Sequence, residues 1–534
     1  MLDSIVLLDY YAIVLNKLLT KIYKGDCMKK GIAVSVCVIA VMVLCVVSAG
    51  AWTGRMSGMG GPYGLVEDES DFLTHPAVIP QGKELTFYGD LSFFKKDVQK
   101  WDVSVNLGNN YAVTREADGD EWNADTRLGF ALPLGVGRMG VFFEYSGNFI
   151  SRGGRYRGNG ADYIGSTTAS PGIIDVRNEN DSIAVRVLYA QPAFNGKAKL
   201  GGEFSVGYVT ETSSVMTDTL YGTLYVRHNY HWDNSFLNGF AYALPYSSRY
   251  WEAKMKASAE TMIGASKLSV TPFGGFILDG DNRYDWDFGS TAPWLIGTHE
   301  GSVSGYHLGT EAWWRLPVNK SISMPILAKA VYSEKKRDGD GTYLWSGPMY
   351  NCDYGSKEKA LNIEIGGGID AQIGRNSRFA GGLYYGYIDS KNDFFFIGYP
   401  IGSVDYPSHP KWKEDRITLK LAAETEISPK VSLNGGLSYY YGWAKQDFER
   451  VRSDSQYSYN LGFDGHVWGL GLSAGAAFRF SGITFEPYLK GSYEDFKTSG
   501  SGLSNNDTST LYSASGNYRK TQWIVGGGFA VKFD

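Results

Sequence analysis

Apolar and charged side chains alternate with a period of two over much of this chain. In residues 416–427, for example, Ile417 and Leu419 fall on one face, whereas Arg416 and Lys420 fall on the other. Successive side chains of a β-strand point to opposite sides, so this segment predicts a strand with one apolar and one ionic face. Apolar and polar side chains also alternate along the strands of a water-soluble β-sandwich, whose polar face meets bulk water. Repetition of the pattern, its spacing and a secretion signal favour a barrel in lipid with its ionic face inward.

The same pattern predicts strands at 101–111, 123–134, 139–150, 182–192, 198–210, 249–263, 267–279, 304–316, 321–333, 359–373, 377–388, 415–427, 431–444, 466–480, 483–495 and 520–533. Short turns alternate with long polar stretches, which we interpret as loops, at 152–181, 211–248, 280–303, 335–357, 389–412, 446–464 and 496–518. This is typical of an outer-membrane barrel with periplasmic turns and extracellular loops. The predicted fold is therefore an all-β, transmembrane, antiparallel up-and-down β-barrel of about 16 strands, within a range of about 14–18.

Aromatic residues mark the ends of several of these strands. Tyr439 and Trp443 end one strand on its loop side, and Tyr385 and Tyr387 end another. Amphipathic rings at this position predict a girdle at the membrane interface. The last strand carries Phe533 one residue before the C-terminus, which resembles the signal by which such barrels reach the barrel-assembly machinery. Outer-membrane lipid and lipopolysaccharide are the other partners expected of such a surface.

The single long apolar run, residues 31–47, lies near the N-terminus. It follows Met28, Lys29 and Lys30 and precedes a run of small residues ending at Ala51. A basic start, an apolar stretch and a small-residue end predict a signal peptide over 28–51; a permanent membrane anchor is the alternative. Residues 1–27 are then an upstream extension from a start codon set too early. Residues 52–83 form an N-terminal hatch or a periplasmic arm, and 84–534 form the barrel. The predicted location is the outer membrane of a Gram-negative-type bacterium.

Composition agrees with this organisation and excludes other classes. The chain has 67 glycines and 15% aromatic residues, but its mean hydropathy is only -0.23. A barrel with long polar loops gives this combination, whereas helical membrane proteins are far more apolar. The formal net charge is -5 and no basic patch predicts nucleic-acid binding. Once the leader is removed Cys352 stands alone, so no internal disulfide is expected.

The alternation also predicts which side chains line the lumen. The inward-facing candidates are Arg127, Glu144, Arg186, Glu203, Glu252, Lys254, Lys256, Glu311, Arg315, Glu364, Asp370, Arg378, Arg416, Lys420, Glu424, Arg479, Glu486 and Lys490. Acidic and basic residues are nearly balanced on this face. A selective ion pore would show a surplus of one sign, so the balance indicates either ion pairs that hold the wall or a weakly selective channel.

The segment before the barrel carries a short motif. Gly58 and Gly60 begin a glycine-rich stretch, acidic residues follow at 67–71, and His75, Pro76 and Ala77 come last. This arrangement resembles the N-terminal hatch of long-chain fatty-acid outer-membrane transporters and of related type-9-secretion barrels, with His75 where asparagine is usual. The resemblance implies a plugged barrel that carries apolar or amphipathic small molecules inward. A disordered or periplasmic arm is the alternative.

Few residues suggest further chemistry. Asp279, Asp281, Asp285 and Asp287 cluster at the end of a predicted strand and in the loop after it, and are candidate ligands for Ca²⁺, although hydrated loop tips have the same composition. The seven histidines are scattered along the chain. No cofactor and no enzymatic activity are therefore expected. The sequence predicts an outer-membrane channel or transporter for small solutes, including apolar or amphipathic ones. A non-transport barrel that acts as a surface scaffold or adhesin is the alternative.

Overall fold

A computed structural model describes residues 54–61, 64–80, 84–106, 112–159, 172–218, 246–287, 296–344, 349–398, 411–450, 459–505 and 511–533. The predicted upstream extension and signal peptide, residues 1–51, lie outside this range, as do residues 219–245. The strands are β1 Thr86–Asn106, β2 Ala112–Leu134, β3 Gly137–Asn159, β4 Gly172–Ala193, β5 Ala198–Asp218, β6 Tyr246–Ile263, β7 Ser266–Asp287, β8 Ile296–Pro317, β9 Ile322–Leu344, β10 Met349–Ile373, β11 Ser377–Gly398, β12 Lys411–Ser428, β13 Val431–Arg450, β14 Tyr459–Phe480, β15 Ile483–Asn505 and β16 Leu511–Phe533.

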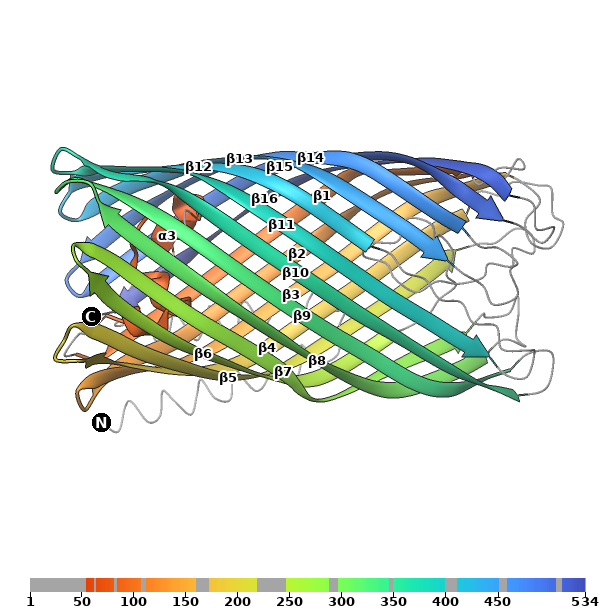
Figure 1. Cartoon of the computed structure of the whole chain (residues 1–534), viewed down its shortest axis with the longest axis horizontal. Helices are drawn as coiled ribbons and strands as arrows, with labels where there is room; N and C mark the ends of the chain where they lie inside the picture. Colours follow the sequence, from red (N-terminus) through yellow and green to blue (C-terminus); the bar gives the residue numbers. More distant parts are fainter. Residues whose placement is uncertain are drawn as a thin grey trace, which may run out of the picture.

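These strands form one closed antiparallel barrel in which each strand pairs with its neighbours in sequence and β1 pairs with β16. Figure 1 shows the long strands tilted against the barrel axis, with the C-terminus at the end that carries the short turns. Gly374 and Gly482 adopt φ values of 68° and 75° in two of these turns, a conformation that suits glycine. The predicted fold and strand number are confirmed. Within the described part of the chain, no helix is long and apolar enough to cross a membrane.

The apolar face of the strands looks outward. Ile365 is 53% exposed and Val525 is 61% exposed, as expected for side chains that meet lipid and not a packed core. Tyr385, Tyr439 and Trp443 are also exposed on the outside of the wall. Charged side chains of the same strands point into the barrel, where they pair with one another. The outer surface is therefore built for a hydrocarbon environment.

The strands are longer than the sequence pattern predicted. β10 has 25 residues, whereas crossing a bilayer requires only about 9–11. The polar stretches expected to be loops therefore continue partly as paired strands, for example over 335–344 and 349–357. Beyond the membrane both faces of a strand meet water, so the apolar alternation disappears while the backbone ladder continues. The first strand was also misplaced: it spans Thr86–Asn106 and not 101–111.

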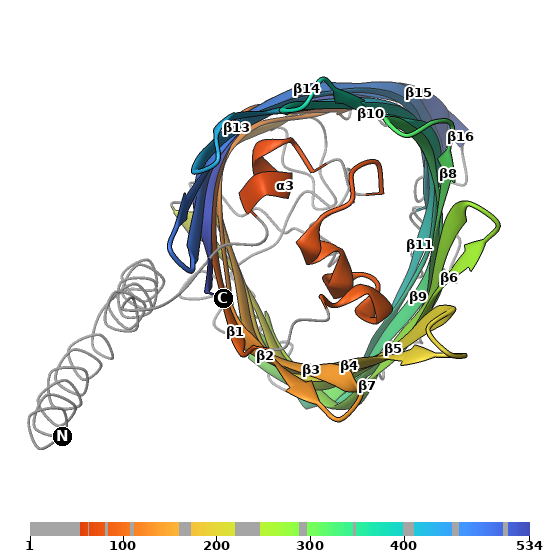
Figure 2. The same cartoon turned by 90° about the vertical axis from the view of Figure 1, so that its left-hand side faces the viewer.

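The N-terminal segment lies inside the barrel. Helix α3 (Gly54–Gly58) is followed by two 3₁₀ turns, η1 (Glu69–Leu73) and η2 (Pro76–Val78). In Figure 2, which looks along the barrel from the turn end, this segment crosses the interior from the β13–β16 wall to the β4–β6 wall. We call its described residues, 54–61 and 64–80, the arm. The described residues of the arm thus lie inside the barrel, in contact with its inner wall.

Candidate functional site

The inner wall carries a chain of ion pairs over β2–β6. Arg127 pairs with Glu144, and Arg186 bridges Glu144 and Glu203 at 3.0 and 3.4 Å. Lys256 then pairs with Glu203 at 3.3 Å. Each residue comes from the strand next to the previous one, because strand alternation puts every second side chain on the inner face. Five predicted lumen residues, one from each of these strands, are therefore brought together into one network.

The other predicted lumen residues also lie on the inner wall. Arg315 and Arg378 both bond to Asp370, at 2.6 Å. Elsewhere the contacts are between neighbours: Glu252 with Lys254 at 2.8 Å, Glu311 with Lys329 at 3.2 Å, Arg416 with Glu414, Lys420 over the Tyr384 ring and Lys490 over the Phe94 ring. Glu364 shares the inner face of β10 with Asp370. Glu424, Arg479 and Glu486 line a cavity at the turn end.

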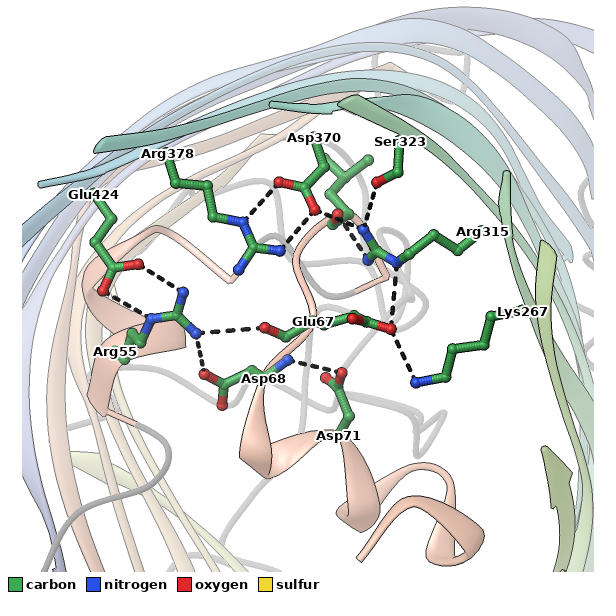
Figure 3. A network of polar contacts seen from close by, with 11 residues as sticks. Arg55, Glu67, Asp68, Asp71, Lys267, Arg315, Ser323, Asp370, Arg378 and Glu424 are labelled. Carbon is green, nitrogen blue, oxygen red and sulfur yellow. Dashed lines mark hydrogen bonds and ion pairs between the residues drawn. The ribbon is translucent and has the colours of Figure 1, made fainter. Parts of the chain in front are cut away.

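Arg55 of α3 fastens the first part of the arm to the wall. Its guanidinium donates to both carboxylate oxygens of Glu424, at 2.9 and 2.6 Å, and to Asp68 at 2.7 Å. Its backbone N–H donates to Glu486 at 2.6 Å. Burial disfavours the charge, but the bonds to Glu424 and Asp68 outweigh it and raise the pKa of Arg55. This cation therefore stays charged and joins Glu424 of β12 to the arm (Figure 3).

The middle of the arm is held by a second ionic contact. The Glu67 carboxylate accepts from Lys267 at 2.9 Å and lies 3.5 Å from Arg315. Burial disfavours its charge, but Lys267 and Arg315 outweigh this and lower the pKa of Glu67. Arg315 also donates to the Leu65 carbonyl at 3.0 Å. Figure 3 shows that these contacts and those of Arg55 lie on opposite sides of the arm.

The last part of the arm meets the wall through polar contacts of buried groups. The His75 imidazole lies 2.5 Å from the Thr271 hydroxyl, and the Ala77 N–H donates to Ser258 at 2.6 Å. Lys256 donates to the Leu73 carbonyl. Burial, and then the nearby lysines, lower the pKa of His75 to about 3. His75 is therefore neutral at physiological pH, and its role here is in packing and hydrogen bonding.

Apolar side chains of the arm fill the space between these polar contacts. Phe72 and Ile79 pack against Phe142 and Leu188 of the wall, and Met56 and Leu65 join a second cluster with wall residues. All four arm side chains are nearly inaccessible to solvent. Burial of this kind contributes about 1.5–3 kcal/mol for each large apolar side chain. The arm is thus a folded part of the protein.

Glycines of the wall make room for the arm. A side-chain carbon at Gly436 of β13 would collide with the Met59 carbonyl, and one at Gly201 of β5 would collide with the Ala77 backbone. Gly58 of the arm and Gly475 of β14 approach so closely that a side-chain carbon on either would lie 3.0 or 3.1 Å from the other residue's Cα. Of the hatch motif, Gly58, His75 and the residues 76–77 therefore touch the wall directly. Gly60 adopts a φ of 80° beside Ser473.

Charged cavities lie beside the arm and beyond it. One of about 570 Å³ is lined by Arg378, Glu424 and Arg479 together with Arg55 of the arm. A second, of about 270 Å³, lies between the arm and Lys267, Trp313 and Arg315. A third, of about 410 Å³, is nearer the loop end and is lined by Tyr250, Glu252, His307 and Trp412 among others. Each combines ionic side chains with apolar surface.

Sequence reasoning missed a group of charges nearer the loop end. Glu211 of β5 bonds to Lys335 and Arg337 of β9 at 2.6 and 3.1 Å, although three strands separate β5 from β9 in the barrel. The bond therefore crosses the bore. Tyr250 also donates to Glu211 at 3.0 Å, and Arg337 pairs with Glu358. Glu211, Lys335 and Arg337 lay in stretches interpreted as loops, and continued alternation of charge was the only signal that could have found them.

The predicted calcium ligands do not form a site in the part of the chain that the structure describes. Asp279 and Asp281 lie within β7 and not in a loop, because the β7 ladder continues beyond the membrane. Their side chains are exposed, and no group of three or more potential ligands occurs among the described residues. Asp285 and Asp287 also belong to β7, but their side chains lie outside the described set.

Comparison with known proteins agrees with the architecture. The autotransporter β-domain family matches residues 362–534, which is under half of the chain. The chain is an outer-membrane β-barrel. A closed wall with an apolar outside, together with this match, places it in the outer membrane of a Gram-negative bacterium. No curated protein matches the chain.

Several solved barrels are similar in outline. They include the P. putida toluene transporter TodX and a Pseudomonas aeruginosa FadL homologue, each with a TM-score of 0.37, 10% identity, and coverage of 91% of this chain and 98% of that chain. The match to the Ralstonia pickettii toluene transporter TbuX has a TM-score of 0.36 and 10% identity, and it covers 90% of this chain and 98% of the TbuX chain. Likenesses this distant say nothing about what this barrel carries.

Proposed function

We propose that this barrel is a channel for small polar or amphipathic solutes, and that the arm closes the passage until it shifts. The observation that carries the proposal is an ionic inner wall interrupted by cavities. Burying ion pairs costs several kcal/mol of desolvation per ion, and an apolar filling of the same volume is often as stable or more stable. A wall needed only for shape would therefore not require so many charges. Charges on the inner wall are instead useful where water and polar solutes pass along the barrel axis and contact them.

The cavities also support the choice of solute. Those beside the arm are lined largely by arginine, lysine and carboxylate side chains. Transport of a fatty-acid-like molecule would instead be supported by an apolar pocket next to the arm. The apolar side chains there are already packed against each other in the two clusters around Phe72 and Met56. Solutes with polar groups, with or without an aromatic or aliphatic part, therefore suit this passage best.

Substitution of the wall glycines tests the role of the arm. We expect the double variant Gly201→Ala/Gly436→Ala to displace the arm, because overpacking costs about 1–3 kcal/mol at each site. Its conductance in planar bilayers should exceed that of the wild type several-fold. Gly202→Ala/Gly435→Ala is the matched control: these positions are next in sequence but face outward, and their nearest contacts are 3.8 and 3.5 Å away. Equal conductance in the two variants would contradict the proposal.

The contacts that fix the arm and the inner wall favour one alternative function, a barrel that serves as a surface scaffold or adhesin. Arg55, Glu67 and the bond of Glu211 across the bore all hold the interior in one arrangement. A scaffold should show no conductance even in the glycine variant, and liposomes that contain it should not swell in sugar solutions. Swelling that requires displacement of the arm would favour the channel.

A further inference from the structure

The cavity nearer the loop end is separate from the arm. Its volume is about 410 Å³, within the range of roughly 300–1,000 Å³ that is usual for small-molecule sites. Two aromatic residues line it, Tyr250 of β6 and Trp412 of β12, together with Ser333 and Ser390. None of the described arm residues is among the lining residues. A solute can therefore occupy this cavity while the arm stays docked.

Trp412 presents one face of its indole to this cavity. Its ring centroid lies 5.3 Å from that of Phe496 of β15, although β13 and β14 lie between β12 and β15. The indole therefore extends along the inner wall, where it also packs against Ala444 and Val467. A ring that is packed on one side and lines a cavity on the other offers an apolar plane to a solute.

Tyr250 and Lys335 hold each other in place on the β6 and β9 side of the cavity. The Tyr250 hydroxyl donates to Glu211 at 3.0 Å. The Lys335 ammonium donates to Glu211 at 2.6 Å and to the Tyr250 hydroxyl at 3.2 Å, and it lies 4.5 Å from the centre of the Tyr250 ring. An ammonium has three N–H groups, so two are used in these bonds and the third is left for a ligand.

The inward-facing charges along the cavity are already paired. Glu252 contacts Lys254 at 2.8 Å and His307 at 3.5 Å, and Glu358 pairs with Arg337. An ionic ligand would have to compete with these partners. A hydroxyl group both donates and accepts, so it can add a bond to a carboxylate or an ammonium without separating the pair. The cavity therefore suits an uncharged ligand that carries several hydroxyl groups.

We propose that this cavity binds a neutral saccharide on its way through the barrel. A pyranose ring has an apolar face of C–H groups that can pack on Trp412. Its rim of hydroxyls can bond to Lys335, to Glu252 and to the two serines. The inference rests on the proposed function, because it requires a solute to enter the bore, and it names the class of that solute. Binding does not require displacement of the arm.

Isothermal titration calorimetry of the purified mature chain, in a detergent without a sugar headgroup, measures this binding directly. The probes are glucose, galactose, maltose and sucrose, and glucuronate is the charged comparison. We expect at least one neutral sugar to bind, and Trp412→Leu to weaken its binding by about tenfold. Trp443→Leu is the matched control, because Trp443 is exposed on the outer face of the neighbouring strand β13. Trp412→Phe keeps an aromatic plane and should bind within about threefold of the wild type.

A second variant tests the hydroxyl partners and does not disturb the packing of Trp412. Ser333→Ala/Ser390→Ala removes two hydrogen-bonding groups from the lining, so we expect it to lower the affinity about tenfold. Unchanged affinity in this variant and in Trp412→Leu overturns the site, and so does a failure of all four neutral sugars to bind. Tighter binding of glucuronate than of every neutral sugar overturns the choice of an uncharged ligand. Retained heat-dependent gel mobility verifies that each variant folds.

Failure of this site and failure of the channel give different results. Sugar binding to the wild type, with no conductance in Gly201→Ala/Gly436→Ala, would support the saccharide site and contradict the channel. High conductance in that glycine variant, with no sugar binding, would support the channel and contradict the saccharide site.

Discussion

His75 gives the arm a dependence on pH. Its pKa is about 3 in the docked arm, lowered by burial and then by Lys256, Lys267 and Lys329, against an ordinary value of 6.5. The docked arm therefore holds His75 neutral, while a released arm would let it take up a proton below pH 6.5. The stabilisation of docking that depends on neutral His75 is fully present above pH 6.5. It decreases by about 1.4 kcal/mol for each pH unit as the pH falls from 6.5 towards 3.

We therefore expect hydrogen exchange over residues 64–80, corrected for the intrinsic rate, to accelerate between pH 7 and pH 5. A change of about 2 kcal/mol at pH 5 corresponds to roughly thirtyfold faster opening. The control variant His75→Gln can still bond to Thr271 but does not titrate, so its exchange should depend less on pH. Burial and the neighbouring Asp68 raise the pKa of Asp71. The protonated Asp71 carboxyl stabilises docking at low pH, and this effect is lost as pH rises. It therefore opposes the effect of His75, and it is present in the wild type and in His75→Gln alike. Identical pH profiles would contradict the role of His75.

At the residue scale, the sequence indicates a direction for a side chain but not its partner. Alternation alone predicted that Glu424 points inward, because a period of two is a local property of a strand. Its bond to Arg55 joins residues that are 369 positions apart, and only the closed barrel brings them together. The short hatch motif falls in the segment that lies inside the bore. It did not show that Arg55 and Glu67 would be the ionic contacts that hold it.

At the element scale, alternation predicts each strand where it crosses lipid and fails where the strand leaves it. The predicted strand 359–373 corresponds to the turn-side part of β10, and the ten residues before it lack an alternating apolar pattern but pair equally well. Backbone hydrogen bonds continue such a ladder without any apolar pattern. Strand number was therefore predictable, since each crossing leaves its own signal. Strand length was not.

The same asymmetry between faces predicts how single strands respond to charge. Leu489 of β15 is 71% exposed on the lipid side, and Ser492 of the same strand points into the bore. We expect Leu489→Arg to destabilise the folded barrel by about 2–4 kcal/mol, because a cation near the membrane midplane is poorly solvated. Ser492→Arg should cost little. Urea titration of each variant folded into lipid vesicles, followed by tryptophan fluorescence, measures the difference, and similar losses would show that the faces were assigned wrongly.

At the scale of the whole molecule, the wall and the arm have different roles in stability. The wall closes because β16 pairs along its length with both β15 and β1. In lipid an unpaired strand edge leaves backbone groups without partners, each at a cost of several kcal/mol. The arm instead touches the wall only from inside, where water can replace its contacts. Closure therefore depends on β16 and not on the arm.

Two deletions separate these roles. Removal of residues 511–534 should abolish the compact, heat-shifted form on gels, because β1 and β15 would both become open edges in the membrane. Removal of residues 54–80 should leave that form intact, with a modest loss of stability in urea. The charges that the arm neutralises, among them Glu424 and Lys267, would then face the bore and be solvated. A barrel that fails to form without the arm would mean that the arm is part of the folding unit, and that its release could not open a passage.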